Sequence, residues 1–474
     1  MDRPVHSSAV TRRFHVRTFG CQMNEHDSEN LAGMLSAAGM VATDDLSEAD
    51  VVLLNTCCIR ENADNRFYGQ LGNLKALKEQ RPELQIAVGG CLAQKDRERI
   101  VERAGHVDVV FGTHNLHRAV ALLDEQRALG EPIVEIADEH APDAAAIVGA
   151  LPAQRDLHHS AWVTIQIGCD NSCTFCIVPL VRGPEVSRRL GDVVHEVEEL
   201  AADGVSEVTL LGQNVNSYGR DLGAGQYRPR FADLLRAVDA VDGIRRIRFT
   251  SPHPKDLRPE TIAAMAECDA VCEHLHLPLQ SGSDRTLARM HRGYTAERYL
   301  ERLDAARAAI PDLAVTTDII IGFPGETDDD FERTLEVVDT AAYDAAYTFV
   351  FSPRPGTPAA QMADLAVAPE VVRERMVRLT EVVEGHALVR HEARVGKIEV
   401  ALVEGPSKTD ATRVSARTGQ GKIAHFDADP ATVPPGAYVR LEVTKAAPHW
   451  LAGELREIVS VPKPRPVRIP VASV

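Results

Sequence analysis

Three cysteines stand in the close spacing Cys169-x-x-x-Cys173-x-x-Cys176, directly after the apolar run 162–167. Three thiolates on one short loop can hold three irons of a cubic iron–sulfur cluster, and the missing fourth cysteine leaves one iron free to bind another molecule. A structural zinc site prefers four protein ligands, and Asp170 and Asn171 are the only other polar candidates nearby. The candidate sites are therefore a reactive 4Fe-4S cluster, a zinc site that lacks its fourth ligand, and buried cysteines.

A second set of three cysteines is spread over the first hundred residues. Cys21, Cys57 and Cys91 each follow a short apolar run that is typical of a buried strand. The carboxyl ends of parallel strands lie on one edge of a sheet, so the three thiols are expected to converge there. Free cysteines also bury readily in a core, and Cys58 could replace its neighbour Cys57. We predict a second 4Fe-4S cluster with three protein ligands and one open iron.

The elements that must position these cysteines follow an α/β pattern. Residues 14 to about 140 alternate apolar runs with helical stretches, which predicts an open parallel sheet. The central region repeats the pattern six times, short of the eight repeats of a closed barrel, and predicts a partial (β/α)6 barrel with its chemistry at the carboxyl ends of the strands. Its apolar runs are 162–167, 208–211, 244–249, 274–277, 315–321 and 347–351.

The last part of the chain differs from the rest in pattern and charge. After a helix over about 372–392, short apolar runs separated by Gly, Pro and Asp predict a small five-stranded barrel. Residues 393–474 carry a net charge of +4, whereas residues 1–392 carry −21. Small barrels often bind nucleic acid, although a structural cap with a solvated surface is the alternative. The candidate phosphate contacts are Arg413, Arg417, Lys422 and Lys445.

Length and composition indicate a multidomain protein of the cytoplasm. The nine cysteines in 474 residues are too few for a disulfide scaffold, and we expect neither a leader peptide nor a membrane-spanning segment. The predicted divisions are an N-terminal cluster-binding domain at 12–140, a linker at 141–158, a barrel domain at 159–392, an RNA-binding barrel at 393–460 and a tail at 461–474.

With these residues in place, the chain resembles the methylthiotransferases, a branch of the radical S-adenosylmethionine (AdoMet) enzymes, over nearly its whole length. The motifs that carry the resemblance are 18–24 (TFGCQMN), 55–57 (NTC), 89–91 (GGC), 168–176 (GCDNSCTFC) and 279–283 (LQSGS). Two departures are Cys58, where serine is common, and Leu180, where an aromatic residue is more usual. Neither departure removes an expected ligand. The resemblance implies that Cys169, Cys173 and Cys176 hold the reactive 4Fe-4S cluster and that the C-terminal barrel is a TRAM module, which contacts RNA in this family.

The resemblance also implies a reaction that uses two AdoMet molecules. One AdoMet donates a methyl group to a sulfur held by the N-terminal cluster, and the other is cleaved at the barrel cluster to give a 5′-deoxyadenosyl radical. Gln22-Met23-Asn24 is similar to the MiaB type, which acts on N6-isopentenyladenosine beside the anticodon of tRNA and adds a methylthio group at carbon 2. The alternatives are the same chemistry on a ribosomal protein side chain or on threonylcarbamoyladenosine, and a non-catalytic iron–sulfur regulator that binds RNA.

Several further residues and partners are expected on the same basis. For AdoMet, the candidates are Phe175, Gln213, Asn214, Asp318 and Gly322. Beyond the cluster ligands, no catalytic residue is assigned, and Arg182, Glu185 and Arg188 could bind substrate or pair with one another. The expected partners are the anticodon loop of tRNA and an electron donor such as flavodoxin or ferredoxin, with the protein acting as a monomer.

Overall fold

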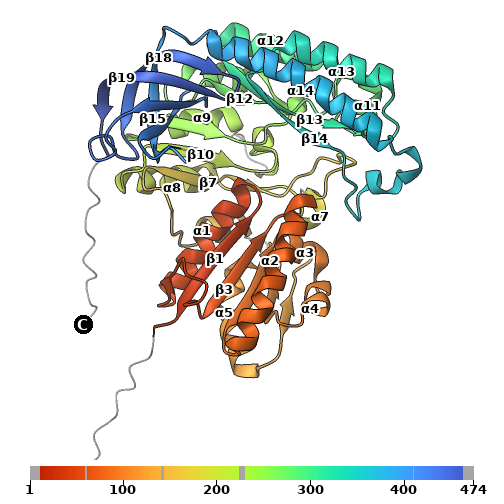
Figure 1. Cartoon of the computed structure of the whole chain (residues 1–474), viewed down its shortest axis with the longest axis vertical. Coiled ribbons are helices and arrows are strands. Elements are labelled where there is room, and N and C mark those ends of the chain that lie inside the picture. The colour runs from red at the N-terminus through yellow and green to blue at the C-terminus, as the bar shows by residue number, and fades with distance from the viewer. Residues whose placement is uncertain (1–10, 59–60, 140–143, 224–229, 409, 463–474) are drawn as a thin grey trace, which may run out of the picture. The chain divides into compact units, whose positions relative to one another are not determined.

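A computed structural model describes residues 11–58, 61–139, 144–223, 230–408 and 410–462, and the chain forms two compact units (Figure 1). Unit 1 comprises Met1–Asp156 and Ile177–Pro184, and unit 2 comprises Leu157–Cys176 and Glu185–Val474. Residues 463–474 of the expected tail lie outside the described residues, as do residue 140, the last of the expected N-terminal domain, and residues 141–143 at the start of the expected linker. Among the helices that the structure describes, none combines the length and the apolar character needed to cross a bilayer.

Unit 1 is built on a six-stranded sheet with the order β2-β1-β3-β4-β5-β6, in which every pairing is parallel. This confirms the predicted open parallel sheet. The strands are β1 (Arg13–Phe19), β2 (Val41–Ala42), β3 (Val51–Thr56), β4 (Gln85–Gly90), β5 (Val109–Phe111) and β6 (Ile133–Glu135). The helices are α1 (Gln22–Ala37), α2 (Glu61–Gln80), α3 (Cys91–Asp96), α4 (Arg99–Arg103), η1 (Leu116–Arg118), α5 (Ala119–Leu129), α6 (Ala144–Gly149) and α7 (Val178–Arg182).

Helices cover both faces of this sheet, and the alternation of side chains along β3 shows how. Val52 and Leu54 pack with apolar residues of α2, α3 and α4 on one face, whereas Val51 and Leu53 pack with α1 and α5 on the other. All four side chains are at most 1% exposed. A strand that is buried on both faces reads as a continuous apolar run, as 51–54 does. The short helix α6 lies within the segment that was expected to be a linker.

Unit 2 begins with six parallel strands arranged as two three-stranded sheets, β11-β10-β7 and β12-β13-β14. A parallel bridge between Ile247 and Val271 joins the sheets where β11 and β12 meet, so the strands follow sequence order in an open half-barrel. The predicted partial barrel is therefore confirmed. Its strands are β7 (Ser160–Thr164), β10 (Glu207–Leu211), β11 (Arg246–Phe249), β12 (His274–His276), β13 (Ala314–Ile321) and β14 (Ala345–Val350), and a hairpin pairs β8 (Gln166–Ile167) with β9 (Val186–Ser187).

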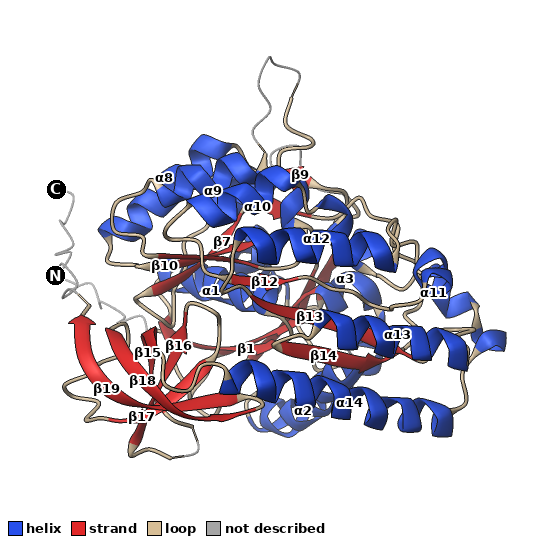
Figure 2. Ribbon diagram, turned by 90° about the horizontal axis from the view of Figure 1, so that it is seen from above, coloured by secondary structure: helices blue, strands red, loops and turns tan. Residues whose placement is uncertain are grey.

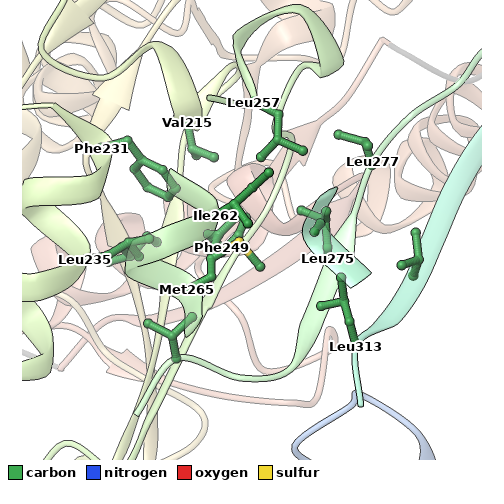
Figure 3. Close-up of a cluster of buried hydrophobic side chains, with 14 of the residues drawn as sticks. Val215, Phe231, Leu235, Phe249, Leu257, Ile262, Met265, Leu275, Leu277 and Leu313 are labelled. Carbon is green, nitrogen blue, oxygen red and sulfur yellow. The ribbon is translucent and has the colours of Figure 1, made fainter. Parts of the chain in front are cut away.

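Helices cover the outer face of the half-barrel, and apolar side chains fill the space between helices and strands (Figures 2 and 3). Phe231 and Leu235 of α9 meet Phe249 of β11 and Ile262 of α10 in this core. The helices are α8 (Leu190–Ala202), η2 (Val215–Ser217), α9 (Phe231–Asp239), η3 (Pro254–Asp256), α10 (Pro259–Glu267), α11 (Asp284–Arg289), α12 (Ala296–Ala309), α13 (Asp328–Ala341), η4 (Pro358–Gln361), η5 (Ala363–Leu365) and α14 (Pro369–Glu392).

The C-terminal part of unit 2 is the predicted closed five-stranded barrel, with the order β15-β16-β17-β19-β18. Its strands are β15 (Ile398–Pro406), β16 (Arg413–Thr418), β17 (Ile423–Asp427), β18 (Tyr438–Ala447) and β19 (Trp450–Ser460). Arg246, at the start of β11, donates hydrogen bonds of 2.7 Å to the carbonyls of Arg417 and Val400. Arg248 donates to the carbonyl of Thr418 at 2.8 Å. The small barrel is thus anchored at the amino-terminal ends of the half-barrel strands, opposite the edge that carries Cys169.

Candidate functional site

The three cysteines of unit 1 leave the carboxyl ends of three neighbouring strands. The register pairs Phe19 with Thr56 and Thr56 with Gly90, so Cys21, Cys57 and Cys91 follow the strands at nearly the same level. The strand order changes direction between β1 and β3, and such switch points are where open α/β sheets bind ligands. The structure therefore places this cysteine trio at the binding edge of the sheet.

Two glycines allow the backbone to pack this closely. A Cβ atom on Gly20 would lie 2.4 Å from the Cβ of Cys57, and one on Gly90 would lie 2.4 Å from the Oδ1 of Asn55. Gly90 also has a φ of +93°, a conformation that side chains other than glycine rarely adopt. The Asn55 amide donates to the backbone oxygen of Asn24 at 2.8 Å, which fixes the turn after Cys21. The glycines are thus explained by close packing around the cysteines.

Two thiols of this trio, those of Cys21 and Cys91, have lowered pKa values that favour the thiolate, which is the form that binds iron. A hydrogen bond from Cys57 lowers the pKa of Cys21 to about 6 against the opposing effect of burial, with help from the positive charge of Arg182. A hydrogen bond from Cys58 and the charge of Arg182 lower the pKa of Cys91 to about 7, although burial opposes this as well. The thiol of Cys58 is the donor to Cys91, and its own pKa is raised. In this structure, Cys58 therefore supports a presumptive ligand rather than replacing Cys57.

Arg182 contacts the trio through a hydrogen bond to Cys91 and also forms an ion pair with Asp27. The sequence predicted neither interaction. The Nε of Arg182 donates to the sulfur of Cys91 at 3.4 Å and its Nη2 donates to the carboxylate of Asp27 at 2.6 Å. The side chains of Arg182 and Asp27 are only 8% and 9% exposed, so this charge pair is nearly dry. The sequence had left open whether Arg182 pairs with Glu185; in the structure the backbone nitrogen of Glu185 instead donates to Asp170.

The three cysteines of unit 2 lie on the loop that follows β8. Cys169 and Cys173 are 8% exposed and Cys176 is half-buried, and burial raises the pKa of Cys169. Within this loop, Thr174 donates two hydrogen bonds. Its backbone nitrogen donates to the Met290 carbonyl at 3.1 Å, and its hydroxyl donates to the Arg289 carbonyl at 2.9 Å. The loop is therefore fixed from outside by the segment that follows α11.

A buried arginine also contacts this second trio. Arg292 donates through Nη1 to the sulfur of Cys173 at 3.3 Å, through Nε to the hydroxyl of Tyr294 at 3.2 Å and through Nη2 to the carbonyl of Pro278 at 3.3 Å. The sequence offered no sign of this residue, because the arginine lies 119 positions from the cysteine that it contacts. Among the described residues, each trio thus has an arginine that donates to one of its sulfurs.

The chemistry of the donor set fits an iron–sulfur cluster better than a single metal ion. A cubic cluster takes thiolate ligands and binds each of them to a different iron. Each trio consists of thiols alone and receives a hydrogen bond from a guanidinium, as cluster sulfurs commonly do from their surroundings.

Side-chain amides at the carboxyl ends of the half-barrel strands have buried polar atoms that find no hydrogen-bond partner among the residues that the structure describes. These atoms are Gln166 Oε1, Gln213 Oε1 and Nε2, Asn214 Oδ1 and Gln280 Oε1. An unpaired buried polar group costs about 1–3 kcal/mol, so such a concentration indicates a polar ligand. Asn214 is itself held by a hydrogen bond of 2.9 Å from its amide to Asp256. A polar ligand at these strand ends would give the unpartnered amide atoms of Gln213 and Asn214 hydrogen-bond partners.

The other candidates for AdoMet contacts have protein partners. Asp318 Oδ2 lies 3.5 Å from His276 Nε2, and Asp318 lies within β13 rather than after it. Gly322 has a φ of +74°, and a Cβ there would lie 2.7 Å from Val372 of α14, so packing explains this glycine. Phe175 packs on the buried cluster formed by Met290, Phe323 and Ala359. This environment agrees with the interpretation that Phe175 shields the cysteine loop.

The four cations expected to contact RNA differ in their surroundings. Lys422 is 6% exposed and its Nζ lies 2.5 Å from the carboxylate of Asp344, so the expectation that it contacts phosphate is corrected. Arg413 pairs with Asp427 at 3.0 Å and Arg417 with Glu404 at 2.6 Å in half-exposed positions. Lys445 is exposed, with its Nζ 5.7 Å from the ring centre of Trp450. Lys445 and Trp450 together present a cation and an aromatic face.

Comparisons with known proteins agree with this architecture. Residues 13–112 match the family described as "Uncharacterized protein family UPF0004", and residues 163–338 match the Radical SAM superfamily. Among solved structures, the radical S-adenosylmethionine methyltransferase TsrM from Kitasatospora setae, with cobalamin and a [4Fe-4S] cluster bound, superposes with a TM-score of 0.51 at 13% identity. The match covers 76% of this chain and 80% of that one, and at this identity it shows the fold alone.

Relatives of much higher identity share nearly the whole chain. A tRNA-2-methylthio-N(6)-dimethylallyladenosine synthase from Parafrankia sp. is 53% identical over 94% of this chain and 90% of its own. Proteins of the same name from Acidothermus cellulolyticus and Mycobacterium marinum are 53% and 50% identical, each over 94% of this chain and over 88% and 86% of their own lengths. The chain therefore belongs to the family of the tRNA-2-methylthio-N(6)-dimethylallyladenosine synthases, within the radical SAM superfamily.

Proposed function

We propose that this protein transfers a methylthio group to carbon 2 of N6-isopentenyladenosine beside the anticodon of tRNA. The observation that carries the proposal is the presence of two cysteine trios, one at the carboxyl ends of three parallel strands in unit 1 and one on the loop that follows β8 in unit 2. The chain that holds them is 53% identical to a tRNA-2-methylthio-N(6)-dimethylallyladenosine synthase. An adenosine in an anticodon loop is already partly unpaired, so its presentation costs less than extraction of a base from a duplex.

Each trio has a separate role in this proposal. Cys169, Cys173 and Cys176 hold the 4Fe-4S cluster that binds AdoMet, while Cys21, Cys57 and Cys91 hold the second cluster. With AdoMet bound, these clusters supply a radical strong enough to break the carbon–hydrogen bond and a methylated sulfur to replace the hydrogen. Carbon 2 of adenine has no good leaving group, which is why a radical route is needed.

The remaining residues position and protect the reactants. Gln213 and Asn214 bind polar groups of AdoMet, because their buried amide atoms otherwise lack partners. Asp256 fixes the orientation of the Asn214 amide. Arg182 and Arg292 hold Cys91 and Cys173 through hydrogen bonds to their sulfurs. Phe175, packed in its apolar cluster, keeps water from the cysteine loop. Asp318 and Gly322 are also proposed to contact AdoMet; in this structure Asp318 already lies beside His276, and Gly322 packs against Val372.

The setting of the reaction is also part of the proposal. The TRAM barrel guides the anticodon loop with Lys445, Arg417 and Arg413, and flavodoxin or ferredoxin supplies the electron. The protein acts as a monomer in the cytoplasm. The strongly negative charge of residues 1–392 restricts RNA contact to a basic path that begins at the small barrel.

The test is mass spectrometry of tRNA nucleosides from a strain that lacks the gene, complemented with wild type or with a Cys21/Cys57/Cys91 triple alanine variant. We expect the methylthio derivative of isopentenyladenosine to disappear on deletion and to return only with wild type. Loss of a threonylcarbamoyladenosine derivative, or of a modified ribosomal protein, would redirect the proposal to those substrates. A regulator without catalysis would produce no 5′-deoxyadenosine when the reduced protein is incubated with AdoMet.

A further inference from the structure

The two arginines that contact cysteine sulfurs differ in how their charge is balanced. The guanidinium of Arg182 forms a buried ion pair with Asp27. By contrast, the hydrogen bonds of Arg292 go to a sulfur, a hydroxyl and a carbonyl, and no ion pair of Arg292 occurs among the described residues. Arg292 is 6% exposed, so solvent does little to screen its charge.

The surroundings of Arg292 add further positive charge. Lys255 donates from Nζ to the side-chain oxygen of Asn171, within the same cysteine loop, at 2.6 Å. The nearby carboxylate of Asp256 lies 2.6 Å from Arg220, so a cation already balances it. His253 is buried beside Tyr294 at 5.7 Å between ring centres and adds no negative charge. The groups that contact Cys173 and Asn171 directly are therefore cationic, while the carboxylates of Asp170 and Glu185 lie near Cys169. Arg182 and Asp27 beside Cys91 form a neutral pair.

A positive charge and hydrogen bonds close to a cluster stabilise its reduced form and raise its reduction potential. A neutral ion pair supplies the hydrogen bond with much less net field. The two halves of the reaction make opposite demands. Reductive cleavage of AdoMet needs an added electron at the barrel cluster, while methyl transfer needs an electron-rich sulfur at the second cluster.

We propose that Arg292 and Asp27 are positioning residues that direct the electron to the cluster beside Cys173 and away from the cluster beside Cys91. This inference rests on the cluster assignment in the proposed function. One electron from a reduced flavodoxin- or ferredoxin-type donor arrives near Arg292 and breaks one carbon–sulfur bond of AdoMet, which releases methionine and leaves the unpaired electron on the 5′-deoxyadenosyl fragment. Near Cys91, a sulfur electron pair forms a bond to the methyl carbon of the second AdoMet, and S-adenosylhomocysteine leaves. The second step consumes no electron, so a neutral environment suits it.

The experiment measures the reduction potential of each cluster separately, by electron paramagnetic resonance during redox titration of the full-length protein. A Cys21/Cys57/Cys91 triple alanine background isolates the barrel cluster, and a Cys169/Cys173/Cys176 background isolates the second. In the first, Arg292→Gln should decrease the reduced-to-oxidised ratio at a fixed potential at least tenfold, which is about 59 mV for one electron, while Arg292→Lys should change it less. In the second, Asp27→Asn should increase the ratio, because it removes the charge that balances Arg182.

The outcomes separate this inference from the proposed function. Triple variants that bind no iron would refute the cluster assignment and with it the inference. Triple variants that each bind four irons, but whose potentials do not move with Arg292→Gln or Asp27→Asn, would overturn the inference alone. If Arg292→Gln loses its iron, Asp27→Asn still decides, because it is nearly isosteric and leaves Arg182 in place. Lys75→Gln, on the exposed surface of α2, is the control and should shift neither potential.

Discussion

Lys422 and Asp344 form a buried ion pair, with Nζ 2.5 Å from Oδ1, that joins the small C-terminal barrel to the half-barrel. Lys422 directly precedes β17 and Asp344 directly precedes β14, and their side chains are 4% and 9% exposed. Burial lowers the pKa of Lys422 while the carboxylate opposes that effect. The pair lies at the same amino-terminal edge as the contacts of Arg246 and Arg248, so the two barrels form one packed body.

Removal of one partner of this pair should destabilise unit 2. Because Lys422→Ala leaves the Asp344 carboxylate buried without its cation, we expect the free energy of unfolding to fall by about 3–5 kcal/mol, measured by urea denaturation. The double variant Lys422→Met with Asp344→Leu should recover most of that loss. Lys445→Ala, at an exposed position of the same barrel, is the matched control. Equal stability of Lys422→Ala and Lys445→Ala would contradict this role.

Lys445 and Arg417 should contribute to RNA affinity without any effect on the chemistry. Each phosphate contact that is lost lowers the slope of log affinity against log salt by roughly 0.7–0.9. We therefore expect Lys445→Ala and Arg417→Ala to weaken tRNA binding and flatten its salt dependence, while 5′-deoxyadenosine formation without tRNA stays at the wild-type level. Lys75→Ala, at an exposed position of α2 in unit 1 and outside the small barrel, is the control and should change both quantities less. Affinity that is unaltered by both variants would remove them from the RNA surface.

Gly90→Ala should damage the N-terminal trio selectively. The new Cβ would lie 2.4 Å from Asn55 Oδ1 and 2.6 Å from the Thr56 carbonyl, at a φ of +93°, so the start of α3 and Cys91 must move. After anaerobic purification, we expect iron per chain to fall from about eight to about four, with the barrel cluster retained. Gly72→Ala, on an exposed part of α2 with no atom within 4 Å of the new Cβ, is the control and should keep all the iron. Full iron content in Gly90→Ala would show that Cys91 tolerates displacement.

His253 should make unit 2 less stable in mild acid. Burial, together with the nearby charges of Arg292 and Lys255, lowers the pKa of His253 from 6.5 to about 2. Below pH 6.5 the unfolded chain takes up a proton that the folded chain refuses, so stability is lost as the pH falls from 6.5 toward 2. As the pH falls from about 7.5 to about 5.5, this group should lower the free energy of unfolding by about 1.4 kcal/mol.

The measurement compares the pH dependence of urea unfolding in wild type and His253→Asn. Asparagine can accept the hydrogen bond that His253 Nδ1 accepts from the nitrogen of Lys255 at 3.1 Å, but it does not titrate. Between pH 7.5 and pH 5.5, the variant should therefore lose about 1.4 kcal/mol less of its free energy of unfolding than the wild type does. His274 and His391, whose pKa values burial lowers to about 3 and about 4, remain in both proteins and cancel from the difference. An identical pH dependence in the two proteins would mean that His253 is not held neutral.

The sequence predicted the strands and the edge that carries the cysteines, because both follow from local patterns. Apolar runs such as 51–54 mark strands buried on both faces, and a cysteine directly after such a run must lie at the carboxyl edge. The short strands β2 and β6, of two and three residues, were missed because they are too brief to show a period. The fold of each domain could therefore be predicted from the sequence, whereas these two short strands could not.

The partners of charged side chains were beyond local reasoning. Arg182 and Cys91 are 91 positions apart, and Lys422 and Asp344 are 78 apart, so no periodicity connects them. Lys422 was expected to face RNA because a lysine in a basic segment is usually exposed, and only its burial reveals the ion pair. Arg417 and Arg413, by contrast, are half-exposed as their strand positions suggest. The sequence therefore indicated the chemistry of these residues but not which residues they pair with in the folded protein.

The division of unit 1 into two stretches of sequence has a consequence for synthesis. The backbone passes from one unit to the other after Asp156, after Cys176 and after Pro184. Ile177 and Val181 belong to the apolar core of unit 1, and Arg182 supplies the cation for Asp27. A ribosome therefore releases nearly the whole N-terminal sheet before the eight residues that complete it. A fragment that stops at Asp156 would lack this piece. Unit 1 can therefore complete its folding only after the CxxxCxxC loop has been translated.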